Sequence, residues 1–259
     1  MNTSQNNSKQ RDCGHCTGKL FVVGIGPGGV PDRTPRAEMA IARSRVVVGY
    51  SRYLVHIADL TAGKETIATG MTREEERCRA AIERADAGEI VALVSSGDPG
   101  VYGMAGLAIE LAQRIAPELD IEIVPGVSAA NAAAAVMGAP LMLDYAVISL
   151  SDLLVSWDMI RCRLKAVAAA DLVTALYNPR SKKRIRHLED AVEIFLRHRP
   201  STTPAGVGTS VGMPNEHIAL TILGDLLSLE INMRSIVIIG NTHSRSVQGW
   251  FVTPRGYAL

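Results

Sequence analysis

Residues 90–115 read IVALVSSGDPGVYGMAGLAIELAQRI: a short aliphatic run (90–95) passes through a glycine-rich turn into a longer amphipathic segment (104–115). A buried strand followed by a helix is the repeating unit of parallel α/β proteins. Working outward, the same alternation predicts strands at 20–23, 45–49, 121–124, 146–150, 172–177, 205–209, 217–222 and 235–239. It predicts helices at 35–43, 128–137, 157–170 and 182–197, and a further helix that opens with a capping box at Thr72 and Glu75 and stops at Gly88. The fold class is therefore α/β.

Composition restricts the partners. The 259 residues carry a formal net charge of +1, so the chain lacks the basic surface expected of a protein that binds nucleic acid or a membrane surface. Aromatic residues are 4% of the chain, which argues against a base-stacking surface. A small molecule is the expected partner.

The N-terminus and the cysteines indicate the compartment. Residues 1–18 are polar and are expected to be a disordered tail, and no stretch has the length and apolar character of a membrane span or a secretory signal. The four cysteines fit neither a disulfide framework nor a complete zinc site, because only Cys13 and Cys16 are closely spaced. We expect a cytoplasmic protein without a metal.

The strand and helix pattern divides the chain into two α/β domains. After the alanine-rich helix, Gly138-Ala-Pro-Leu141 reads as a break. The expected domains are residues 19–143 and 144–259, following the tail.

Residues 24–29, GIGPGG, follow the first strand and match the G-x-G-x-x-G pattern of dinucleotide-binding folds. The context differs, because Pro27 and Pro31 separate the glycines from the next helix, and Gly49-Tyr50-Ser51 stands where an acidic residue would meet a ribose. This glycine loop is expected to bring backbone close either to a flat ligand or to another loop.

Two more turns follow strand ends in the first half. In 95–103, Asp98 precedes Pro99 and is interpreted either as a helix N-cap or as a carboxylate that pairs with an ammonium group of a ligand. The turn at 124–130 is built from small residues. The carboxyl ends of parallel strands meet at one edge of a sheet, so these turns are expected to converge with the glycine loop.

The second half has its own strand-end loops, at 177–179, 206–209 and 240–242. The first of these precedes a basic run, Arg180, Lys182, Lys183, Arg184 and Arg186. A solvated helix start is one interpretation. Cations oppose the helix dipole at an N-terminus, so a polyanionic ligand is the other.

VGIGPGG (23–29), SSGDPGVYGMAG (95–106) and IVPGVSAANAAAAVMGAPL (123–141) together resemble the tetrapyrrole methylase family, in which they occur in this order. ALYNPRSKKR (175–184), SIVIIGNTHSR (235–245) and VTPRGY (252–257) extend the resemblance over nearly the whole chain. It implies two α/β domains with S-adenosylmethionine in the cleft between them, and a homodimer.

Carried over motif by motif, the resemblance assigns cofactor contacts to Pro27, Ser96, Gly97, Asp98, Val101, Ser128, Ala129, Tyr177, Asn178, Gly208 and Asn241. Arg180, Lys182 and Lys183 are the candidates for binding the carboxylates of a tetrapyrrole substrate. No catalytic residue is assigned. Asp144, Ser149, Ser151 and Asp152 are each placed to serve as a general acid or base, and each is equally a turn or cap residue.

The motifs are most similar to the members of the family that methylate ring carbon 17 of precorrin-3B and contract the ring to precorrin-4 in cobalamin biosynthesis. A corrin-pathway methylase acting on a cobalt-containing ring is the alternative within the fold. A nicotinamide oxidoreductase and a non-catalytic tetrapyrrole-binding protein are the alternatives from other classes.

Overall fold

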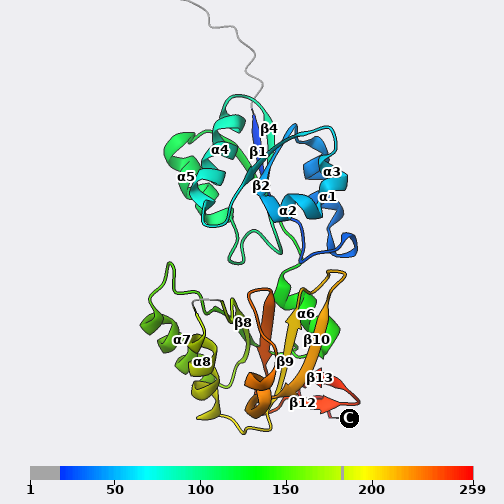
Figure 1. Ribbon diagram of the computed structural model, residues 1–259, viewed down its shortest axis with the longest axis vertical. Helices are drawn as coiled ribbons and strands as arrows, with labels where there is room; N and C mark the ends of the chain where they lie inside the picture. The colour runs from blue at the N-terminus through cyan, green and yellow to red at the C-terminus, as the bar shows by residue number, and fades with distance from the viewer. Residues whose placement is uncertain (1–17, 182–183, 259) are drawn as a thin grey trace, which may run out of the picture.

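The computed structural model describes residues 18–181 and 184–258 and folds into two stacked lobes, blue to green and green to red in Figure 1. The N-terminal lobe is a five-stranded sheet of order β3-β2-β4-β1-β5, and every pairing in it is parallel. Its strands are β1 (Lys19–Gly24), β2 (Val46–Tyr50), β3 (Glu65–Thr69), β4 (Ile90–Ser95) and β5 (Asp120–Val124).

Alternate side chains of these strands bury against helices on opposite faces of the sheet. Leu20, Val22 and Leu93 pack with α4 (Glu74–Asp86) and α5 (Ala105–Ile115). Phe21 and Val23 pack with α1 (Pro35–Arg43) and α2 (Ser51–His56) on the other face. Because both faces are covered, the central strands β1, β2 and β4 are continuously apolar, as the sequence predicted.

Four elements of this lobe were not predicted from the sequence: β3, α2, α3 (Ala58–Thr61) and the short 3₁₀ helix η1 (Val30–Asp32). Strand β3 is an edge strand with mostly exposed side chains, so it has no apolar run to reveal it. The predicted capping box is wrong. Helix α4 begins at Glu74 after Arg73, which makes no side-chain cap, and Thr72 has a left-handed backbone (φ 62°) and bonds the Met71 carbonyl.

The C-terminal lobe is built on a mixed sheet of order β10-β9-β11-β8-β7. Its strands are β7 (Tyr145–Ser149), β8 (Val173–Tyr177), β9 (Pro204–Thr209), β10 (His217–Ile222) and β11 (Ser235–Ile239). Only β7 and β8 pair in parallel; the other neighbours are antiparallel. A small sheet of β12 (Arg245–Val247), β13 (Trp250–Val252) and β6 (Gly138–Ala139) completes the lobe.

Helices cover both faces of this sheet (Figure 1). Helices α7 (Trp157–Ala169) and α8 (Arg186–Leu196), with the 3₁₀ helix η2 (Leu223–Ser228), form a core with Leu176, Val207 and Val237. Helix α8 begins at Arg186, later than predicted, so Arg180 and Arg184 lie in the loop before it and do not oppose its dipole.

The other face carries helix α6 (Ala129–Met137), whose alanines pack on Val173, Ala175 and Ile238. The sequence analysis placed this helix in the first domain, 19–143. Its packing places it in the second core, so the two cores divide at residues 125–128. The small alanine side chains allow the close approach to the sheet, which periodicity alone does not reveal.

Two expectations lie outside the described residues: the disorder of the polar tail up to residue 17, and the positions of Lys182 and Lys183. Within the described ranges, no helix combines the length and apolar character needed to cross a membrane.

Candidate active site

Three turns of the N-terminal lobe meet through backbone contacts at the carboxyl edge of its sheet. The Ile25 amide donates to the Ser95 carbonyl (2.9 Å), and Gly26 and Gly97 exchange hydrogen bonds of 3.2 and 2.7 Å. A Cβ on Gly24 would lie 2.6 Å from the Gly97 oxygen and 2.7 Å from the Gly126 nitrogen. The prediction that these turns converge is confirmed, and the glycine loop is in close contact with the neighbouring turns.

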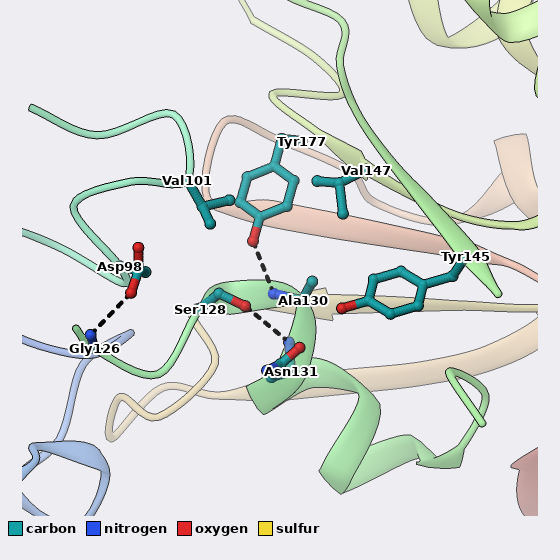
Figure 2. A pocket seen from close by; sticks show the side chains of 9 residues that line it. All are labelled: Asp98, Val101, Gly126, Ser128, Ala130, Asn131, Tyr145, Val147 and Tyr177. Carbon is teal, nitrogen blue, oxygen red and sulfur yellow. Dashed lines mark hydrogen bonds between the residues drawn. The ribbon is translucent and has the colours of Figure 1, made fainter. Parts of the chain in front are cut away.

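Asp98 ties two of these turns together. Its carboxylate accepts the Gly100 amide at 2.8 Å and the Gly126 amide at 3.1 Å, the second bond joining the turn after β4 to the turn after β5 (Figure 2). Helix α5 begins only at Ala105, after Met104. The interpretation of Asp98 as an N-cap is therefore wrong, and its carboxylate sits in the turn.

The start of helix α6 lies beside Asp98. Ser128 caps the helix by accepting the Asn131 amide (3.3 Å), and the Tyr177 hydroxyl accepts the Ala130 amide (3.0 Å), as Figure 2 shows. The Ala129 amide has no hydrogen-bond partner within the described part of the chain. One helix N-terminal donor therefore remains for a ligand.

A pocket of about 270 Å³ opens between the lobes at this point. Both lobes and the segment between them line it: Asp98, Val101, Gly126, Ser128, Ala130, Asn131, Tyr145, Val147 and Tyr177 (Figure 2). Tyr145 and Val147 are alternate residues of β7, so both face the same side. Burial raises the pKa of the Tyr177 phenol, which therefore stays protonated at neutral pH.

Not all predicted cofactor residues line this pocket. Asp98, Val101, Ser128 and Tyr177 do. The others adjoin it or lie apart.

Of the others, Ser96 and Gly97 lie in the converging turns, while Ala129 packs in the α6 core. Asn178 donates to the Ser149 hydroxyl (3.0 Å). Pro27 lies against the turn at Gly212.

Two residues of the second domain that were predicted to contact the cofactor, Gly208 and Asn241, do not line the pocket. A Cβ on Gly208 would meet Ala133 of α6 at 3.4 Å, so this residue supports the helix behind the pocket. Asn241 follows β11 at the end where Ile239 pairs with Thr174, the opposite end of β8 from Tyr177. Its side chain accepts from Ser244 within its own turn. We therefore leave Asn241 out of the site.

Charged and polar groups gather near the carboxyl ends of β7 and β8. Arg180 pairs with Glu189 (3.2 Å), and Arg184 donates to the Asn178 carbonyl (3.0 Å). Asp152 bonds His187 at 3.1 Å, and the His187 ring lies 4.0 Å from that of Trp157, measured between centroids. Among the acid–base candidates, Asp152 is thus paired, whereas Asp144 is exposed and makes no side-chain hydrogen bond with the described residues.

Sequence reasoning missed five lining residues: Gly126, Ala130, Asn131, Tyr145 and Val147. Gly126 and Ala130 lie in the turn at 124–130, so their neighbours in the motif pointed to them. Tyr145 and Val147 carry no motif, and only the parallel pairing of β7 with β8 brings them beside Tyr177.

The pocket combines the Asp98 carboxylate with the rings of Tyr145 and Tyr177, and the unpaired Ala129 amide lies beside it, between the lining residues Ser128 and Ala130. The carboxylate suits an ammonium group and the amide suits a carboxylate, so the pair fits an amino acid moiety. Aromatic faces suit a cation. Within the described residues, no group of three or more His, Cys, Asp or Glu side chains converges as a metal site would require.

Comparison with known proteins gives consistent matches. The family profile for "Tetrapyrrole (Corrin/Porphyrin) Methylases" matches residues 19–227. A Salmonella typhimurium protein named "Probable cobalt-factor III C(17)-methyltransferase" is 45% identical, over 93% of this chain and 100% of its own length. The "Precorrin-3B C(17)-methyltransferase" of Sinorhizobium sp is 39% identical, over 93% and 98% respectively.

A solved structure shows the same likeness. The crystal structure of the methyltransferase CobJ superposes with a TM-score of 0.85 at 36% identity, covering 92% of this chain and 100% of that one. The profile match spans well over half of the sequence and includes the turns that line the pocket. The chain therefore belongs to the tetrapyrrole (corrin/porphyrin) methylase family.

Proposed function

We propose that this chain transfers a methyl group from S-adenosylmethionine to ring carbon 17 of precorrin-3B, with ring contraction to precorrin-4, in cobalamin biosynthesis. The observation that carries the proposal is the inter-lobe pocket lined by Asp98, with the free Ala129 amide beside it at the start of helix α6; the two groups complement the two charged ends of an amino acid. The names of the relatives support the substrate and the carbon methylated.

The pocket residues fit the donor. When bound, S-adenosylmethionine supplies an electrophilic methyl group on a sulfonium. Asp98 pairs with the ammonium of its methionine end, and the N-terminus of α6 at Ala129 receives the carboxylate. The rings of Tyr145 and Tyr177 exclude water and present aromatic faces to positive charge.

The acceptor is assigned to the adjoining edge of the C-terminal lobe. Arg180, together with Lys182 and Lys183, attracts the carboxylates of the tetrapyrrole. Asp152 and His187 lie at the same edge of the lobe, and we assign to this pair the proton transfers that ring contraction needs.

A cobalt-containing ring is the second candidate substrate. Identity to the relative named for cobalt-factor III is 45%, against 39% for the relative named for precorrin-3B. The pocket residues described above do not distinguish the two substrates, because they are proposed to bind the methyl donor and not the macrocycle. The difference must therefore be tested with the macrocycles themselves.

The family resemblance further suggests a cytoplasmic homodimer. Exposed apolar side chains of the C-terminal lobe, Val247, Trp250 and Tyr257, offer a surface for the second copy. Light scattering on the purified full chain tests this: a mass of twice 27.7 kDa supports the homodimer, and a monomer at micromolar concentration contradicts it.

The decisive experiment incubates the purified protein with S-adenosylmethionine and either precorrin-3B or cobalt-factor III, following the ultraviolet–visible spectrum and the gain of one methyl group by mass spectrometry. Methylation of precorrin-3B confirms the proposal, and methylation of cobalt-factor III alone selects the second candidate. Methylation of neither, with NAD binding in calorimetry, favours the oxidoreductase. Macrocycle binding without binding of S-adenosylhomocysteine favours a non-catalytic protein.

A triple variant, Arg180→Glu with Lys182→Glu and Lys183→Glu, tests the acceptor side. Charge reversal should raise KM for the macrocycle about tenfold through lost electrostatic attraction, while the Kd for S-adenosylhomocysteine stays within twofold. Unchanged values of both would assign these residues to the solvated surface.

A further inference from the structure

Tyr102 of the N-terminal lobe forms hydrogen bonds with the edge of the C-terminal sheet. Its hydroxyl accepts the Ser149 amide at 2.9 Å and donates to the Val147 carbonyl at 3.1 Å. Strand β7 is the last strand of its sheet. The Leu150 amide donates inward to Tyr177 on β8, so the Ser149 amide, one residue earlier, points to the open edge. Tyr102 therefore occupies backbone groups at the edge of β7 that no strand of the described residues pairs with.

The backbone of Tyr102 is held in an unfavourable conformation to make this contact. Its φ is 52°, in the left-handed region that side chains other than glycine rarely adopt. Such strain persists only where surrounding contacts compensate for it. The two hydrogen bonds to β7 are contacts of that kind.

The ring of Tyr102 also lies against Tyr177, a residue that lines the pocket. It lies 5.2 Å from the Tyr177 ring, between centroids, at an interplanar angle of 55°. Tyr177 in turn holds the first turn of α6 through the Ala130 amide. The residue before Tyr102, Val101, lines the pocket from one lobe, and Val147 lines it from the other. Tyr102 thus joins the two sides of the pocket.

We propose that Tyr102 is a positioning residue whose hydroxyl latches the turn 98–103 to the edge of β7 and so sets the spacing of the lobes around the donor. The contact between Tyr102 and β7 does not depend on the proposed function. Only the identity of the ligand, S-adenosylmethionine, rests on it. Tyr102 is 55% exposed, so the edge groups it releases return to water. Opening the latch therefore affects ligand retention more than folding.

Tyr102→Phe tests the latch because it keeps the ring and removes the hydroxyl. In the full chain without ligand, NMR should show the Ser149 amide exchanging about tenfold faster, since that amide loses its acceptor. The Kd for S-adenosylhomocysteine should rise about fivefold, the scale of one or two hydrogen bonds. KM for S-adenosylmethionine should rise with it while kcat stays within twofold.

Tyr145→Phe is the matched control, because Tyr145 lines the same pocket and its hydroxyl has no hydrogen-bond partner within the described residues. Its Ser149 exchange should equal that of the wild type. The proposal would be overturned if the Ser149 amide exchanged no faster in Tyr102→Phe than in the wild type. It would also be overturned if the exchange of that amide accelerated equally in Tyr145→Phe. Faster exchange in Tyr102→Phe, with no binding of S-adenosylhomocysteine by the wild type, would keep the latch and refute the function.

Discussion

The two lobes build their shares of the pocket from different materials. The N-terminal lobe uses backbone packed on backbone, where a Cβ on Gly24 or on Gly126 would overlap the carbonyl oxygen of Gly97. The C-terminal lobe uses side chains, chiefly the phenols of Tyr145 and Tyr177. A contact between two backbone segments is lost when a substitution adds a single Cβ atom. A contact made by a side chain can be changed gradually, because substitutions can remove one group and leave the rest of the side chain in place. The N-terminal turns therefore form the fixed part of the site and the C-terminal strands the adjustable part.

The largest effect is expected where the backbone packing is broken. A Cβ at Gly126 would overlap the Gly97 carbonyl oxygen, and neither backbone segment has a flexible end to move. Gly126→Ala should lower the free energy of unfolding by about 3 kcal/mol and abolish binding of S-adenosylhomocysteine. Urea unfolding and calorimetry measure these two quantities.

Gly106→Ala is the control for that substitution, because a Cβ there meets open space on helix α5. It should raise the free energy of unfolding by about 0.5 kcal/mol and leave ligand binding unchanged. A Gly126→Ala protein as stable and as active as the wild type would show that the turns can separate.

The next effect concerns the side chain that joins two backbone turns. Asp98→Ala removes the acceptor of the Gly100 and Gly126 amides and the partner of the ligand's ammonium. The free energy of unfolding should fall by about 1–2 kcal/mol, and the Kd for S-adenosylhomocysteine should rise by at least about thirtyfold, which corresponds to about 2 kcal/mol or more of lost binding free energy. Calorimetry on folded protein separates the two. Lower stability with intact affinity would restrict Asp98 to a structural role.

On the adjustable side, Tyr177→Phe should have a smaller effect. It leaves the Ala130 amide without its acceptor while the ring stays in place. Thermal unfolding should show a loss of about 1 kcal/mol, and the Kd for S-adenosylhomocysteine should rise about threefold. A loss as large as that of Gly126→Ala would contradict the division into fixed and adjustable parts.

The smallest effect is a pH dependence in the N-terminal lobe. Arg33, which follows the glycine loop, is buried and makes a bidentate pair with Asp59 at 3.1 and 2.7 Å. Hydrogen bonding from Arg33 lowers the pKa of Asp59. The pair therefore stabilises the fold fully above the ordinary carboxyl pKa, and this contribution is lost as the pH falls through the lowered value.

Asp59→Asn should accordingly cost about 0.5–1 kcal/mol at pH 7, because the carboxylate is exposed, and less in acid. Urea unfolding from pH 7 to pH 3 measures the difference between variant and wild type. A difference that stays constant or grows in acid would exclude the ion pair as its source.

The strands of the two five-stranded sheets except β3, most helices and the convergence of the three N-terminal turns were predictable from the sequence, because continuous apolar runs and glycine-rich turns report local structure directly. Sequence reasoning failed where the outcome depends on distant partners. Helix α6 carries the same alanines whichever sheet it covers, and its place on β8 and β11 follows only from tertiary packing. Asp98 resembled an N-cap until the helix was found to start at Ala105. Tyr145 lies in no motif. Tyr102 lies in the turn 95–103, but its hydrogen bonds to β7 could not be predicted, because the strand order defines which strand forms the edge of the sheet.

The most direct test of the account is a crystal structure of the full chain with S-adenosylhomocysteine bound. We expect the amino acid end of the ligand between the Asp98 carboxylate of the N-terminal lobe and the Ala129 amide of helix α6, with Tyr177 of the C-terminal lobe in contact with it. Ligand bound to one lobe alone, away from these residues, would contradict the claim that both lobes enclose the methyl donor.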